Sequence, residues 1–139
     1  MFRLDYGRVM RALAAYAERK VREGALAVIL IGSLARGDYT AFSDADVVIV
    51  VPDGSVPDNP VERVRGFLDP SLPLDLQPFV YTRSELIEMA RESRRIVGEV
   101  LRVGKLLAGD RGILEELKGL WKSDRKSLRT AGEGSENAL

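Results

Sequence analysis

Three aspartates are the residues most able to do chemistry, and two of them are separated by a single residue. Asp44 and Asp46 flank an alanine at the start of a hydrophobic run, Val-Val-Ile-Val-Val. Because alternate residues of a strand point to the same face, a strand here would present both carboxylates side by side. Two such charges ~4 Å apart repel by about 4 kcal/mol at an effective dielectric near 20. A divalent cation turns this repulsion into ligation, so the pair favours a site for Mg²⁺ or Mn²⁺.

Asp75 supplies a third carboxylate. It interrupts an alternating stretch, residues 72–80, on the side that also carries Gln77 and Phe79. If this stretch is a strand beside the one that follows Asp46, Asp75 can meet Asp46 and complete a metal site. In the alternative interpretation, Asp44 caps a turn, Asp46 is solvated at a strand end and Asp75 is a surface residue. For an isolated Asp-x-Asp this alternative would be favoured. The presence of Asp75 and of the Gly-Ser element described next favours the metal site instead.

Gly32 and Ser33 lie where a buried strand is expected to end and a short helical turn to begin. A glycine there lets the backbone approach a phosphate, and N–H groups with a hydroxyl suit an anion. Arg36 lies one turn further on and can reach a triphosphate oxygen. The alternatives are an ordinary turn with Ser33 as its N-cap and a solvated Arg36. No Gly-Lys-Ser/Thr follows and Gly-x-Gly-x-x-Gly is absent, so this is neither a P-loop nor a dinucleotide fingerprint.

The composition excludes several kinds of chemistry. The 139 residues contain no Cys and no His, which excludes disulfides, zinc–thiolate sites, thiol nucleophiles and Ser-His-Asp catalysis. Lys+Arg and Asp+Glu both number 21, so no basic excess indicates a nucleic-acid partner. No stretch reaches the ~20 apolar residues of a membrane span and no signal peptide is visible, so we expect a cytoplasmic protein. With 45% hydrophobic residues, the chain can fill the core of one domain.

Hydrophobic periodicity and capping signals predict the elements that position these residues. Helices are expected at residues 5–23, 61–68, 82–91, 93–103 and 111–121, a short helical turn at 34–37, and strands at 25–31, 47–51, 72–80 and 105–108. Pro73 and Pro78 place the third strand near an edge. The prediction is an α/β fold, with a small mixed β-sheet of three to four strands and helices mostly on one side. Residues 1–121 would form the domain, and the polar residues 122–139 a disordered C-terminal tail.

The stretch GSLARGDYTAFSDADVVIV resembles the signature of the DNA-polymerase-β-like nucleotidyltransferase superfamily, Gly-Ser-x10-Asp-x-Asp followed by a hydrophobic strand. In particular, it is similar to the minimal nucleotidyltransferases paired with HEPN-domain proteins in prokaryotic toxin–antitoxin systems. The similarity covers about residues 25–108 and implies the nucleotidyltransferase fold. It further implies roles for the individual residues: Gly32 and Ser33 would hold the triphosphate, Asp44 and Asp46 would bind both metals, and Asp75 would complete the metal site and activate the acceptor hydroxyl. Arg36 and Ser43 are further candidates for binding the nucleotide.

By this resemblance, the protein would move a nucleoside monophosphate, AMP from ATP, to an acceptor hydroxyl and release pyrophosphate. The acceptor would be a tyrosine of a HEPN-type toxin, with the chain acting as its antitoxin in a hetero-oligomer. An arginine-rich face on the helices after Thr82 is the expected docking surface. Two alternatives stay open: a non-catalytic antitoxin that acts by contact, and a homodimeric enzyme that modifies a small, antibiotic-type molecule. The sequence leaves the acceptor, the base and the oligomeric state undecided.

Overall fold

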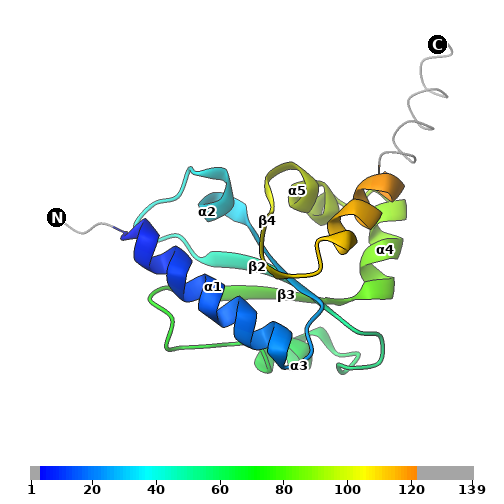
Figure 1. Cartoon of the computed structure of the whole chain (residues 1–139), viewed down its shortest axis with the longest axis horizontal. Helices are drawn as coiled ribbons and strands as arrows, with labels where there is room; N and C mark the ends of the chain where they lie inside the picture. Colours follow the sequence, from blue (N-terminus) through cyan, green and yellow to red (C-terminus); the bar gives the residue numbers. More distant parts are fainter. Residues whose placement is uncertain (1–3, 122–139) are drawn as a thin grey trace, which may run out of the picture.

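The computed structural model describes residues 4–121, which form one mixed four-stranded sheet with helices packed around it (Figure 1). The elements in chain order are α1 (Tyr6–Arg22), β1 (Ala27–Ile31), α2 (Gly32–Arg36), β2 (Ala45–Val51), α3 (Pro60–Arg65), β3 (Leu76–Thr82), α4 (Arg83–Arg91), α5 (Arg95–Val103) and β4 (Lys105–Gly109). A last helix covers residues 112–121. No helix in this part of the chain combines the length and hydrophobicity needed to cross a bilayer. The expected tail, residues 122–139, lies outside the described residues.

The sheet has the strand order β3-β2-β1-β4. β1 pairs antiparallel with both β2 and β4, whereas β2 and β3 run parallel. The predicted α/β fold with a small mixed sheet is therefore confirmed. β3 is an edge strand, as its prolines predicted, and it begins at Leu76 rather than Leu72. Pro73 has no N–H to donate to a ladder, which agrees with this later start.

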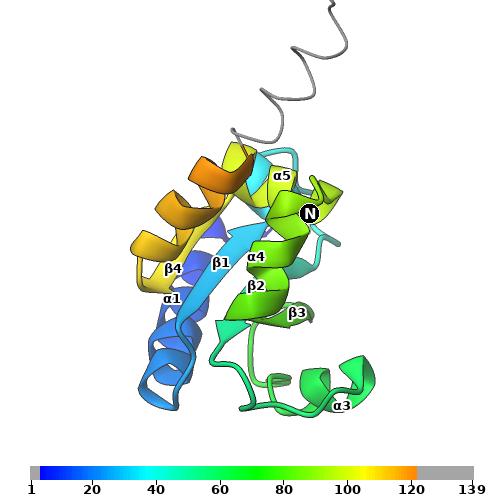
Figure 2. The same cartoon turned by 90° about the vertical axis from the view of Figure 1, so that its right-hand side faces the viewer.

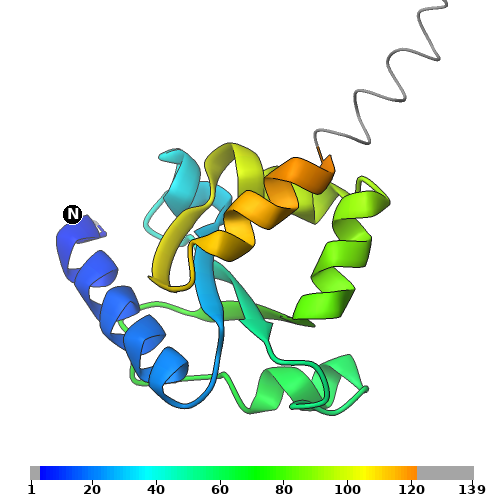
Figure 3. The ribbon, with the colours of Figure 1, turned by 45° about the vertical axis from the view of Figure 1, so that its right-hand side comes forward.

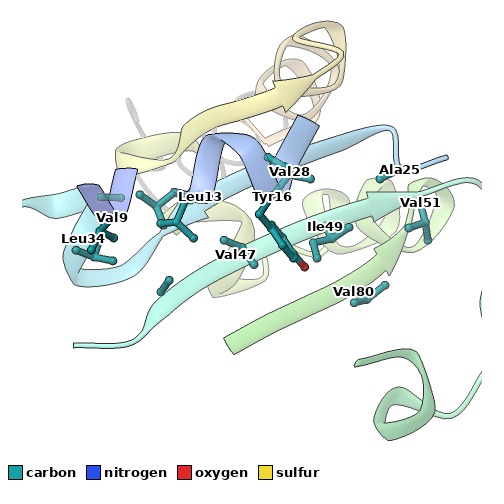
Figure 4. Close-up of a cluster of buried hydrophobic side chains, with 14 residues drawn as sticks. Val9, Leu13, Tyr16, Ala25, Val28, Leu34, Val47, Ile49, Val51 and Val80 are labelled. Carbon is teal, nitrogen blue, oxygen red and sulfur yellow. The ribbon is translucent and has the colours of Figure 1, made fainter. Parts of the chain in front are cut away.

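Helices cover both faces of the sheet, which explains the uninterrupted hydrophobic runs of β1 and β2. α1 lies on one face, where Leu13 and Tyr16 pack against Val28 and Val47 (Figure 4). α4, α5 and the 112–121 helix lie on the other face (Figure 2). Figure 3 shows the 112–121 helix beside α5, with α1 at the far side of the strands. The two faces alternate along each strand, so the residues that flank the site have their orientation fixed by a packed core.

Local capping sets most of the helix boundaries. Asp5 accepts a hydrogen bond from the Arg8 N–H at the start of α1. The capping box predicted at Thr82 is present, with both of its reciprocal bonds to Glu85. α3 begins at Pro60, as its position at the first turn predicted.

Candidate active site

The site lies where β1 ends and β2 begins. Antiparallel pairing places Ile31 opposite Asp46, so Gly32, the next residue, lies beside the Asp46 side chain. Gly32 has a positive φ of 75°, and a Cβ added there would collide with the Asp46 carboxylate. Only glycine allows this close approach of backbone and carboxylate without strain.

Asp44 and Asp46 form an interacting pair of carboxylates. They lie two residues apart at the start of β2, with Asp44 exposed and Asp46 half-buried. Burial raises the pKa of Asp46, and the negative charge of Asp44 raises it further. The ionised pair is therefore unfavourable by itself, and the site would be stabilised by an added positive charge.

The parallel pairing of β2 with β3 brings Asp75 to the same edge of the sheet. The Ala45 N–H donates to the Asp75 carbonyl at 2.8 Å, and Ala45 is in register with Leu76. This register places Asp75 beside Asp44, whereas the sequence prediction placed it against Asp46. The Asp75 side chain is exposed, and within residues 4–121 no three carboxylate side chains lie together as a metal-binding group. The pairing of Asp75 with the two other aspartates around a metal stays a prediction.

Ser33 and Ser43 lie within hydrogen-bond distance of each other. The Ser33 hydroxyl donates to Ser43 Oγ at 3.1 Å, and the Thr40 N–H donates to the same atom at 2.8 Å. Ser43 therefore ties the loop before β2 to α2. Ser33 is not the N-cap of α2, because Ile31 occupies that position without a side-chain cap, so the N-cap role that the alternative gave to Ser33 is wrong.

Arg36 is paired with two carboxylates. Its Nη1 donates to Glu99 Oε2 at 2.7 Å and its Nε to Asp38 at 3.3 Å. The Gly32 N–H donates to the same oxygen of Glu99 at 3.3 Å. Glu99 lies on one of the helices after Thr82 that were expected to dock a partner, and the sequence did not predict its place in the site. Nothing local to the sequence signals this contact, because packing of α5 against α2 joins residues far apart in the chain.

The mixed sheet therefore presents an aspartate pair beside a Gly-Ser turn. The sequence model of the family described as "Nucleotidyltransferase domain" matches residues 11–101. The chain belongs to this family and is by class a nucleotidyltransferase. Comparison with curated proteins gave no match.

Solved structures with the same fold come from toxin–antitoxin complexes. One is described as a toxin–antitoxin crystal structure with AMP-PNP and has a TM-score of 0.59 at 18% identity, covering 94% of each chain. Another, described as the toxin–antitoxin MntA-HepT, has a TM-score of 0.53 at 16% identity, covering 91% of this chain and 92% of its own. These likenesses support the nucleotidyltransferase fold.

Proposed function

We propose that this chain is a metal-dependent nucleotidyltransferase that moves AMP from ATP to an acceptor hydroxyl. The observation that carries the proposal is the pair Asp44 and Asp46, of which Asp46 lies directly against Gly32 at the turn that leads into Ser33. In the reaction, the acceptor oxygen attacks the α-phosphorus, the bond to the leaving pyrophosphate breaks, and the acceptor proton passes to a carboxylate. Asp75 is the proposed proton acceptor because the register of β2 and β3 places it beside Asp44.

The donor set of the site suits Mg²⁺ or Mn²⁺, which prefer carboxylate oxygens. Asp44 and Asp46 would hold the metal, with Asp75 as the third ligand. The raised pKa of Asp46 supports this fit, since the two largest causes of the shift, burial and the negative charge of Asp44, favour an added cation. When bound, the metal would neutralise charge on the triphosphate.

Gly32, Ser33, Ser43 and Arg36 are proposed to hold the triphosphate. The Gly32 N–H and the Arg36 guanidinium already share a carboxylate oxygen, so both donors point toward one anionic atom. Ser33 and Ser43 lie within hydrogen-bond distance of each other, at 3.1 Å.

The proposed acceptor is a tyrosine of a HEPN-type partner protein, which would make the chain an antitoxin. The likeness to toxin–antitoxin structures, one of them with AMP-PNP, supports a protein partner and a nucleotide. The arginine-rich face expected to dock the partner is partly self-paired, because Arg94 contacts Glu92 at 3.2 Å and Arg102 contacts Glu99 at 3.8 Å. Arg94 and Glu92 are both exposed, and such a pair contributes little to stability, so Arg94 can exchange partners in a complex.

The test is to incubate the chain with a HEPN-type protein, ATP and Mg²⁺. The partner's intact mass should rise by about 329 Da per AMP, only when divalent metal is present, and pyrophosphate should appear in equal amount. The Asp46→Asn variant is the matched control and should leave the mass unchanged. An unmodified partner in a stable complex would favour the antitoxin that acts by contact. If no complex forms, a small-molecule hydroxyl becomes the better acceptor.

A further inference from the structure

Glu99, on α5, lies against the proposed phosphate site but has no part in the chemistry above. Its side chain is 20% exposed, and its Oε2 accepts from the Gly32 N–H at 3.3 Å and from Arg36 Nη1 at 2.7 Å. Its other oxygen, Oε1, lies 3.8 Å from Arg102 Nη2. One carboxylate oxygen therefore engages two of the donors proposed for the triphosphate.

A simple ion pair between α5 and α2 would not require the contact with the Gly32 amide. Arg36 has a second partner in Asp38, and Glu99 has one in Arg102. Moreover, the N-cap position of α2 has no side-chain hydrogen bond, so Glu99 supplies an acceptor that the turn lacks locally. The contact brings a further negative charge toward the aspartate pair, where Glu99 adds to the effects that raise the pKa of Asp46. The Glu99 carboxylate therefore accepts hydrogen bonds from Gly32 and Arg36, but its negative charge is unfavourable beside the aspartate pair.

We infer that Glu99 occupies the position of a nucleotide phosphate oxygen and competes with the nucleotide for Gly32 and Arg36. This inference rests on the proposed function. A bound polyphosphate replaces Glu99 Oε2 at both donors, and Arg102, three residues along α5, receives the released carboxylate. Because the competitor is a single carboxylate, a ligand with several phosphate groups and an accompanying divalent cation displaces it more readily than inorganic phosphate does. Glu99 is thus a positioning residue that sets the affinity of the site and its preference for triphosphates.

The experiment is calorimetric titration of the full chain with ATP and Mg²⁺, using the wild type, Glu99→Gln and Glu99→Asp. Both variants should bind ATP more tightly, by roughly three- to tenfold, because a charge-assisted hydrogen bond no longer has to be broken. Glu99→Asp keeps the charge on a shorter side chain that cannot hold both donors, so it separates competition from a general effect of charge. Glu92→Gln is the control: it removes one negative charge near the start of α5, where Glu92 contacts Arg94, and should leave the affinity unchanged. Thermal unfolding verifies that each variant is folded.

A second measurement is the amide NMR signal of Gly32. Without nucleotide, this signal should differ between the wild type and Glu99→Gln, and saturation with ATP and Mg²⁺ should bring the two to the same position. If no variant binds ATP, the proposed nucleotide site fails, and the inference fails with it. If the wild type binds ATP but Glu99→Gln binds no more tightly, or Glu99→Asp matches the wild type, only the competition is overturned. Glu99 would then be a structural support of α2 or a source of general negative charge.

Discussion

At the scale of single residues, the ionised Asp46 carboxylate is unfavourable in the protein alone and would be stabilised by a bound cation. Gly32 leaves room for its carboxylate, and both burial and the neighbouring Asp44 raise its pKa. A residue kept under such conditions is expected to contribute to function rather than to folding. Its removal should therefore separate the two properties.

The first prediction is that Asp46→Asn lowers nucleotidyl transfer by roughly a hundredfold or more, the scale seen when one group that stabilises a transition state is removed. The same variant should be more stable than the wild type at neutral pH. Because the folded-state pKa of Asp46 is raised, its ionised form disfavours the folded state, and the gain is present above that pKa. The gain should vanish as the pH falls below the ordinary aspartate value of about 3.9.

Thermal unfolding in EDTA across this pH range tests the stability of Asp46→Asn, and pyrophosphate release tests its activity. Asp38→Asn is the control for loss of a carboxylate, because Asp38 is exposed and lies outside the Asp44–Asp46 pair, contacting Arg36 at 3.3 Å. An active Asp46→Asn, or one that melts several degrees lower at neutral pH, contradicts the assignment.

The second prediction concerns Gly32→Ala. Its φ of 75° disfavours any side chain, and the added methyl would meet the Asp46 carboxylate. Backbone strain of this kind costs about 1–3 kcal/mol, so unfolding should occur at lower denaturant concentration and ATP binding should be lost. Gly37→Ala is the matched control: its φ is 94°, but a Cβ there meets nothing within 4 Å. It should lose stability through backbone strain alone, and so no more than Gly32→Ala, while keeping ATP binding. Equal effects on binding would argue against a special role of Gly32.

At the scale of elements, an ion pair between the buried Arg63 and the partly exposed Glu85 joins α3 to α4. Arg63 is 7% exposed and donates to both oxygens of Glu85, at 2.6 and 2.9 Å, and also to the carbonyl of Val80 at 3.3 Å. Glu85 accepts from the Thr82 N–H as well, within the capping box of α4. A single side chain therefore both caps α4 and neutralises the buried guanidinium.

The third prediction is that Glu85→Ala destabilises the domain by about 2–3 kcal/mol, because it leaves a buried charge unpaired and removes the capping box. The hydrogen bonds from Arg63 lower the pKa of Glu85. The contribution of these hydrogen bonds to folding stability is therefore present above the ordinary glutamate pKa. It is lost as the pH falls through the lowered pKa of Glu85. Denaturant unfolding should show that the difference in stability between Glu85→Ala and wild type is smaller at acid pH than at neutral pH.

Glu88→Ala is the control, because Glu88 lies on the exposed side of α4. It should change stability by no more than about 0.5 kcal/mol. Equal losses in both variants would refute the role of the Arg63–Glu85 pair.

The fourth prediction is that Ser93→Gly stabilises the turn between α4 and α5. Ser93 has a φ of 57°, and among the described residues its Oγ is buried without a hydrogen-bond partner. Glycine is favoured at this left-handed position after a helix and has no hydroxyl to bury. Stability should rise by about 0.5–1 kcal/mol, measured by denaturant unfolding. Ser93→Ala removes the buried hydroxyl but keeps a Cβ at the positive φ, so it should gain less stability than Ser93→Gly. A larger gain for alanine would show that the effect comes from the buried hydroxyl rather than from the backbone conformation.

Most elements could be predicted from the sequence because their signals are local. The capping box at Thr82 and the uninterrupted apolar run of β1 each act within a few residues. The start of β3 was placed too early, because the alternation before Leu76 continues through residues that pack on the core without joining the ladder. The position of Asp75 opposite Asp44 depends on the parallel register, and the position of Glu99 depends on how α5 packs. Both are products of tertiary structure that no local pattern encodes.

At the scale of the whole molecule, the two faces of the sheet depend on different parts of the chain. One face is closed by α1, near the start of the chain, and the other by α4, α5 and the 112–121 helix (Figure 3). Ile113 and Leu117 are buried in that second core. A Cβ added at Gly98 on α5 would lie 3.2 Å from the Trp121 ring, so the end of this helix packs closely on α5. The helix of residues 112–121 is therefore part of the domain and not an extension of it.

The last prediction tests the proposed domain, residues 1–121, by truncation. A chain that ends at residue 121 should unfold at the temperature of the full chain and keep its affinity for ATP. A chain that ends at residue 111 loses Ile113 and Leu117 from the core, and removal of each such side chain costs about 2–5 kcal/mol. Because the stability of a domain is itself only about 5–15 kcal/mol, this shorter chain should be unfolded or only partly folded by near-UV circular dichroism. A marked drop in melting temperature for the 1–121 chain would show that residues 122–139 contribute to the fold, and the domain boundary would then have to move.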